Sequence, residues 1–181
     1  TAREKRFTCK RNRFLTLIRK HPGISRVRCA EIMNLSTFNI SRLAQQLLDE
    51  GMIQEECARL NDDGSPIQGR PPLNLYLNPE YAYIAGIDFE ATAWRLCIID
   101  FRGNEVYRSQ RNFAPCDTAE AYCNNMTMLL KAEIKQAPRL FSNVKGIGIA
   151  APGIIDPHEG VVKEYSALPN FENIPVRNIH Q

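Results

Sequence analysis

The segment from Ser25 to Gly51 constrains the fold more than any other part of the chain, because apolar residues repeat with a helical period on both sides of a short polar turn. Residues 26–33, before the turn, carry three apolar side chains spaced for one helical face: Val27, Ala30 and Met33. This spacing predicts a short amphipathic helix.

A second amphipathic helix is predicted after the turn at Asn34-Leu35-Ser36. Ser36 can cap this helix, because a serine hydroxyl at such a position accepts a hydrogen bond from a free backbone N–H of the first turn. From Thr37 onward, apolar residues fall at i, i+3, i+4, i+7 and i+8, which predicts one buried stripe made of Ile40, Leu43, Ala44, Leu47 and Leu48.

The stripe leaves other side chains facing outward near the N-terminal half of the second helix. In a helix-turn-helix, such positions meet base edges and phosphates. The pattern therefore predicts DNA contacts from Ser36, Thr37, Phe38, Asn39, Ser41, Arg42 and Gln45. An ordinary pair of core helices has the same periodicity, so the pattern alone leaves both interpretations open.

Positive charge is concentrated in the same part of the chain. The net charge is +7 over residues 1–50, −3 over residues 51–80 and −1 over residues 81–181. A basic face beside a helix-turn-helix is what neutralisation of DNA phosphates requires. The distribution favours DNA binding and adds Arg11 and Arg26 to the predicted contacts.

A helix before this segment and a hairpin after it complete a predicted winged helix. The helix spans about residues 12–21 and ends at Pro22-Gly23, since proline cannot extend the helical hydrogen bonds. Strands are predicted at 52–56 and 73–77. Their connecting loop holds Arg70 beside prolines, where an extended arginine can enter a narrow A·T-rich minor groove. The alternative is that these residues only shape the loop.

The composition changes at Asn78-Pro79-Glu80, which predicts two domains, residues 1–78 and 79–181. The second is expected to contain three antiparallel strands at 82–88, 93–100 and 105–113, a crossover helix from about 118 to 136, a buried parallel strand at 144–150 and a hairpin at 154–162. The apolar positions of its helix include Ala121, Met128, Leu129, Ala132 and Ile134. The predicted fold class is α+β, a winged helix-turn-helix followed by a partial α/β domain of the ribonuclease H-like, actin-like ATPase type.

Several segments of the chain, in this order and spacing, resemble the ROK family of sugar-responsive repressors and sugar kinases. They are residues 35–53, Gly69-Arg70-Pro71, Gly86-Ile87-Asp88, residues 100–103, residues 146–156 and residues 168–171. The resemblance implies a cytoplasmic transcriptional repressor of sugar uptake and catabolism genes that binds operator DNA. It also implies a homodimer or tetramer whose DNA binding changes when a sugar or sugar phosphate binds.

The chain departs from the family's kinases at their phosphate loop, which has the form Asp-x-Gly-Gly-Thr. Here the sequence is Asp88-Phe89-Glu90-Ala91-Thr92. Phenylalanine obstructs a close approach to phosphate and glutamate repels it, so we expect neither ATP binding nor catalysis. The resemblance also implies further elements after Val176, among them a cysteine-rich zinc loop. We therefore expect an N-terminal fragment, with structural zinc, if any, in the missing part.

Few residues suggest small-molecule chemistry within this span. Pro152 and Gly153 follow a predicted strand at the end where α/β proteins bind ligands, so they are the candidate inducer contacts; turn geometry is the alternative. The six cysteines are scattered, which predicts reduced cytosolic thiols and no metal site. No apolar run approaches eighteen residues, so no membrane partner is expected.

The sequence thus favours a DNA-binding repressor of sugar-utilisation genes. Two alternatives remain: a ROK-type sugar kinase with an appended DNA-binding module, and a scaffold that uses the winged helix for protein contacts. The kinase is disfavoured by Phe89 and Glu90. DNA binding with a steep salt dependence would separate the repressor from the scaffold, because phosphate contacts release counterions.

Overall fold

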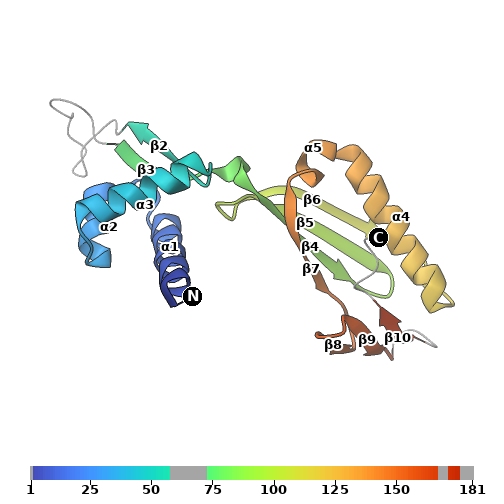
Figure 1. Ribbon diagram of the computed structural model, residues 1–181. Coiled ribbons are helices and arrows are strands. Elements are labelled where there is room, and N and C mark those ends of the chain that lie inside the picture. The colour runs from blue at the N-terminus through green and yellow to red at the C-terminus, as the bar shows by residue number, and fades with distance from the viewer. Residues whose placement is uncertain (1, 58–72, 167–170, 176–181) are drawn as a thin grey trace. The chain divides into compact units, whose positions relative to one another are not determined.

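The computed structural model describes residues 2–57, 73–166 and 171–175 (Figure 1). The chain divides into two compact units, Thr1–Tyr81 and Ala82–Gln181. The division lies three residues after the boundary at residues 78 and 79 that the sequence predicts. The predicted wing loop with Arg70 lies outside the described residues.

The first unit combines helices with a small antiparallel sheet. Its described elements are α1 (Ala2–Lys20), β1 (Ile24–Ser25), α2 (Arg26–Met33), α3 (Thr37–Asp49), β2 (Ile53–Cys57), β3 (Leu73–Leu77) and a 3-10 turn (Pro79–Tyr81). β3 lies between β1 and β2 and pairs antiparallel with both. The two-residue strand β1 carries too short a pattern to be predicted from the sequence.

The core of this unit follows the stripe predicted for the second helix. Ile40, Ala44 and Leu47 of α3 have no exposed surface, Leu43 is buried, and Leu48 is half-buried at the margin. These side chains share the interior with Phe14, Ile18, Cys29, Met33 and Leu75. Burial of the stripe fixes which face of α3 remains in solvent.

Two predictions for this unit were wrong in detail. α1 begins at Ala2 instead of about residue 12. The residues in between contain neither proline nor glycine, so nothing in them stops a helix from extending. In α2 the buried face is Cys29, Ala30 and Met33, while Val27 is 59% exposed. At about 100° per residue, Val27 points well away from the centre of that face.

The second unit is built on a four-stranded sheet of order β6-β5-β4-β7. Its first strands are antiparallel neighbours, and β7 returns parallel to β4 after the helix, as the sequence predicts. α4 runs along one face of this sheet (Figure 1). The elements are β4 (Tyr83–Phe89), β5 (Ala93–Ile99), β6 (Glu105–Asn112), α4 (Ala119–Gln136), α5 (Pro138–Phe141) and β7 (Val144–Ala150).

A second, three-stranded antiparallel sheet follows β7. It consists of β8 (Ile154–Asp156), β9 (Val161–Glu164) and β10 (Glu172–Pro175), with β9 in the middle. The pair β8–β9 confirms the predicted hairpin. Neither β10 nor the short helix α5 was predicted.

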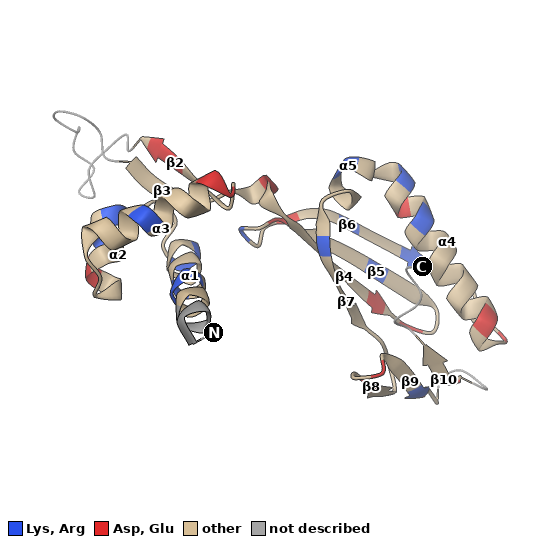
Figure 2. Ribbon diagram, viewed as in Figure 1, with Lys and Arg blue, Asp and Glu red and all other residues tan. Residues whose placement is uncertain are grey.

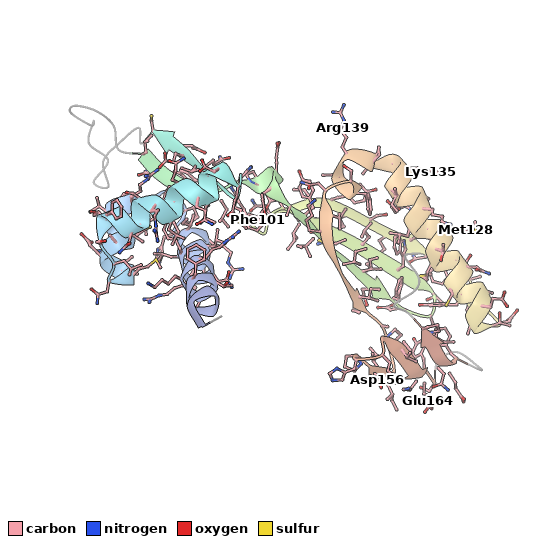
Figure 3. All side chains as sticks on the ribbon, viewed as in Figure 1. Phe101, Met128, Lys135, Arg139, Asp156 and Glu164 are labelled. Atoms are coloured by element: carbon pink, nitrogen blue, oxygen red, sulfur yellow. The ribbon has the colours of Figure 1, made fainter. Side chains whose placement is uncertain are left out.

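The face of α4 that packs on the sheet is only partly apolar. Tyr122, Met126, Leu130 and Glu133 are buried. Of the apolar positions named from the sequence, Ala121, Met128, Ala132 and Ile134 are exposed, and Leu129 is half-buried. Met128 projects away from the sheet in Figure 3. A list of apolar residues does not identify the buried stripe of this helix, because that stripe contains a phenol and a carboxylate.

Strand β7 was predicted to be buried, but it is largely solvent-accessible. It forms one edge of the four-stranded sheet, with β4 as its only neighbour in the described part of the chain. Ile147 is 44% exposed as a result. An apolar strand sequence predicts a buried environment but does not predict whether the covering element belongs to the same segment of chain.

Glu133 anchors α4 to β6 through a polar cluster inside this unit. The carboxylate is 1% exposed and accepts a hydrogen bond from the Ser109 hydroxyl at 2.7 Å. It also accepts one from the Tyr107 hydroxyl and pairs with the Arg111 guanidinium at 2.9 Å. The bond to Glu133 raises the pKa of Tyr107, since it stabilises the protonated phenol. The cluster therefore satisfies a carboxylate that would otherwise be buried at high cost.

Candidate nucleic-acid interface

Polar caps at both helix starts fix the geometry of the turn between α2 and α3. The Ser25 hydroxyl accepts a hydrogen bond from the Arg28 N–H at 3.2 Å, and the Ser36 hydroxyl accepts one from the Asn39 N–H at 3.3 Å. Asn34 ends α2 in the left-handed conformation with φ 52°, which asparagine tolerates better than most residues. The predicted cap and turn are confirmed.

The outward face of α3 presents the predicted side chains to solvent. Phe38, Arg42 and Gln45 lie at i, i+4 and i+7, so they form one row along the helix. All three are exposed, as are Ser36, Thr37 and Asn39 beside them, and Ser41 is half-buried. Among the residues that the structure describes, Arg42 forms no ion pair, so its guanidinium is available to a phosphate or a base.

The charge of α3 changes along its length. Arg42 lies in the N-terminal half, whereas Asp49 ends the helix and accepts a hydrogen bond from Gln45 at 2.9 Å. Figure 2 shows lysine and arginine along α1, α2 and the first part of α3, with acidic colour at the far end of α3 and on β2. A polyanion is therefore attracted to the N-terminal half of α3 and repelled by its C-terminal end.

Two predicted DNA contacts are held within the protein instead of joining Arg42. Arg11 pairs with Glu50 at 2.5 Å, which links α1 to the end of α3. Arg26 pairs with Glu55 at 2.7 Å, which links α2 to β2. These pairs position the helices and neutralise both guanidinium groups locally. Their partners lie 39 and 29 residues away along the chain, so no sequence spacing indicated them.

The candidate inducer residues Pro152 and Gly153 lie in the tight turn between β7 and β8. Gly153 has φ 92°, and a Cβ at this position would lie 2.1 Å from the Glu164 carbonyl oxygen of β9. Only glycine fits so close to another backbone, which supports the structural explanation for this residue. Pro152 is half-buried beside it.

The loop between β4 and β5 carries the residues that replace the phosphate loop of sugar kinases. Phe89 is 2% exposed and stacks on Trp94, with ring centroids 6.5 Å apart. The Arg95 guanidinium donates to Asp88 at 2.8 Å and to Glu90 at 2.6 Å. Hydrogen bonding to Arg95 lowers the pKa of Glu90, so this carboxylate stays charged at neutral pH. The end of β4 and the loop after it thus present two carboxylates, both bound to Arg95.

The described residues offer little for metal or thiol chemistry. Within them, no group of three or more His, Cys, Asp or Glu side chains could hold a metal ion. Burial raises the pKa of the Cys29 thiol to about 11 and also raises that of Cys123, so both thiols are protonated at neutral pH. No helix in the described ranges is long and apolar enough to span a membrane.

The sequence of the chain matches a known protein family. The model of the ROK family matches residues 84–179, which is more than half of the chain. The chain belongs to the ROK family. This ROK chain is 28% identical over 160 residues to the xylose repressor of Caldicellulosiruptor bescii, a match that covers 87% of the chain and 38% of that repressor. It is 26% identical over 161 residues to the xylose repressor of Bacillus subtilis, covering 89% of the chain and 40% of that repressor.

A solved structure shows the same fold across both units. It is the crystal structure of a ROK family transcriptional regulator described as a homologue of the E. coli MLC protein. The TM-score is 0.65 and the identity 16%, and the match covers 92% of this chain and 41% of that one. The present chain thus spans about two fifths of the length of the ROK proteins that it matches.

Proposed function

We propose that this chain is the DNA-binding and first sensor part of a sugar-responsive transcriptional repressor. The observation that carries the proposal is the exposed row on α3, in which Arg42, without an ion pair among the described residues, lies on a helix held by a capped turn. Membership of the ROK family supports it, as do two relatives named xylose repressor whose matches cover 87% and 89% of the chain.

In this proposal, residues 1–78 form a winged helix on double-stranded operator DNA. The order of helices and strands in the first unit fits that motif. The N-terminal half of α3 enters the major groove, where Thr37, Asn39 and Arg42 meet bases and phosphates. The loop between β2 and β3 carries Arg70 into the adjacent minor groove. Arg11 and Arg26 act indirectly by holding α1 and α2 against α3 and β2.

The second unit is proposed to be the first part of an actin-like α/β domain. In the intact cytoplasmic protein this domain binds a sugar or sugar phosphate and pairs subunits into a homodimer or tetramer. Pro152 and Gly153 follow the carboxyl end of β7, the edge at which α/β proteins bind ligands. They remain our candidate inducer contacts, with Gly153 acting through the shape of the turn.

We further propose that the protein is not a sugar kinase. Asp88 at the end of β4 and Glu90 just after it correspond in sequence to the phosphate loop of such kinases, and Arg95 is already bound to both carboxylates. Because Phe89 fills the core beneath, the loop backbone cannot open without losing that packing. ATP-dependent phosphorylation of a sugar by the full-length protein would contradict this part of the proposal.

Replacement of Arg42 by alanine tests the DNA-binding role. Duplexes enriched from a random pool by the chain serve as the probe, and binding is titrated at 50 and 200 mM salt. Loss of one phosphate or base contact is expected to weaken binding about tenfold. If the lost contact is to a phosphate, the slope of log K against log salt concentration should also become shallower by about one.

Arg139→Ala is the matched control, because Arg139 is an exposed arginine on α5 in the other unit (Figure 3). This variant is expected to bind like the wild type. Equal affinities for Arg42→Ala and the wild type would contradict the role assigned to α3. A protein that enriches no duplex would instead support the scaffold alternative.

A further inference from the structure

Phe38 of α3 is not part of the core that the described residues form. Its side chain is 74% exposed, more than any other large apolar side chain among the described residues. It is the second residue of the helix, next to the Ser36 cap, and lies opposite the buried stripe. An aromatic ring of this size contributes most when buried, so a partner that covers it would gain binding free energy.

The surroundings of Phe38 restrict what that contact can be. Thr37 and Asn39 flank the ring along the chain, and Arg42 lies one turn further on the same face. All three neighbours are polar and exposed. A single apolar ring in a polar, cationic setting fits a partner that offers one small apolar group among negative charges.

The major groove of DNA has this character. Its edges carry hydrogen-bond donors and acceptors, its walls carry phosphates, and its one apolar group is the 5-methyl of thymine. We infer that Phe38 packs on a thymine 5-methyl and so specifies a T·A pair at one position of each half-site. This inference rests on the proposed function and deepens it, since it assigns an apolar base contact beside the polar contacts of Arg42.

Replacement of thymine by deoxyuridine isolates the methyl group, because it changes nothing else on the base. The full chain first enriches duplexes from a random pool, and each thymine of the enriched site is then replaced singly. For the wild type, deoxyuridine at one position is expected to weaken binding about fourfold, because the complex no longer buries one methyl group. Phe38→Ala is expected to bind both duplexes alike.

Two further variants define what the result means. Phe38→Leu keeps an apolar side chain and should retain part of the discrimination, while Arg42→Ala should bind more weakly but keep the full ratio between thymine and deoxyuridine. Because the ring is exposed, its removal should leave the circular dichroism spectrum unchanged.

The possible failures are distinguishable. If no duplex is enriched, the proposed function fails and this inference fails with it. If a duplex is enriched but Phe38→Ala discriminates thymine from deoxyuridine as well as the wild type does, the inference alone is overturned. If Phe38→Ala binds DNA as tightly as the wild type but has a different oligomeric state, the inference is likewise overturned, and Phe38 is assigned to a protein contact.

Discussion

Replacement of Glu133 by alanine is expected to lower the free energy of unfolding of the second unit by about 3 kcal/mol, because it removes the acceptor shared by a buried polar cluster. The Tyr107 and Ser109 hydroxyls would lose their partner, and Arg111 would lose its counterion. Arg111 is 44% exposed and can regain water, which keeps the loss below that of a fully buried pair. Urea unfolding followed by tryptophan fluorescence measures the effect, since the single tryptophan, Trp94, lies in this core.

Glu133→Gln and Glu105→Ala are the matched comparisons. Glutamine keeps one acceptor oxygen, so one of the two hydroxyls can still donate to it, and this variant should lose less stability than alanine. Glu105 pairs with Arg108 on the surface of the same strand, β6. Replacement of Glu105 by alanine should therefore leave the midpoint of urea unfolding nearly unchanged. If Glu133→Ala and Glu105→Ala unfold at the same urea concentration, the buried cluster does not anchor α4.

Replacement of Gly153 by alanine is expected to cost about 2–4 kcal/mol in the same unfolding experiment. The new Cβ would lie 2.1 Å from the Glu164 carbonyl oxygen, so the backbones of β8 and β9 would have to separate. The residue would also be held at φ 92°, a conformation unfavourable for alanine.

Gly103→Ala separates the two causes. Gly103 has φ 96°, but a Cβ there would meet nothing within 4 Å, so this variant carries the conformational cost without the clash. We expect it to lose about 1 kcal/mol. A Gly153→Ala protein as stable as Gly103→Ala would show that the turn can relax, and the glycine would then need an explanation outside the fold, such as the inducer.

The fold was predictable where a pattern repeats over a long enough segment. The stripe on α3, from Ile40 to Leu47, follows directly from its spacing, and the cap at Ser36 marks where the helix begins. The strands flanking the loop at residue 103 were predicted for a similar reason, since alternation and turn formers agree there. The parallel pairing of β7 with β4 then follows from a helix placed between two strands of one sheet.

Prediction failed where burial depends on distant partners. Glu133 of α4 is buried because residues of β6 satisfy it, and no local pattern contains that information. The predictions for the candidate interface show the same difference between local pattern and tertiary contact. The exposed row from Phe38 to Gln45 was predicted from helical geometry, whereas the pairing of Arg11 and Arg26 with Glu50 and Glu55 depends on tertiary contacts. Charge in the sequence indicated where a polyanion could bind, but not which cations are already neutralised.

Dimethyl sulfate probing of bound DNA reports whether the N-terminal half of α3 occupies the major groove. This reagent methylates guanine N7 in the major groove and adenine N3 in the minor groove, so one experiment reports on both. On a duplex enriched by the chain, we expect protection of guanine N7 within the site, and we expect that protection to be lost at matched occupancy in Arg42→Ala. Bound DNA with fully reactive N7 atoms, or protection confined to adenine N3, would contradict this placement of α3.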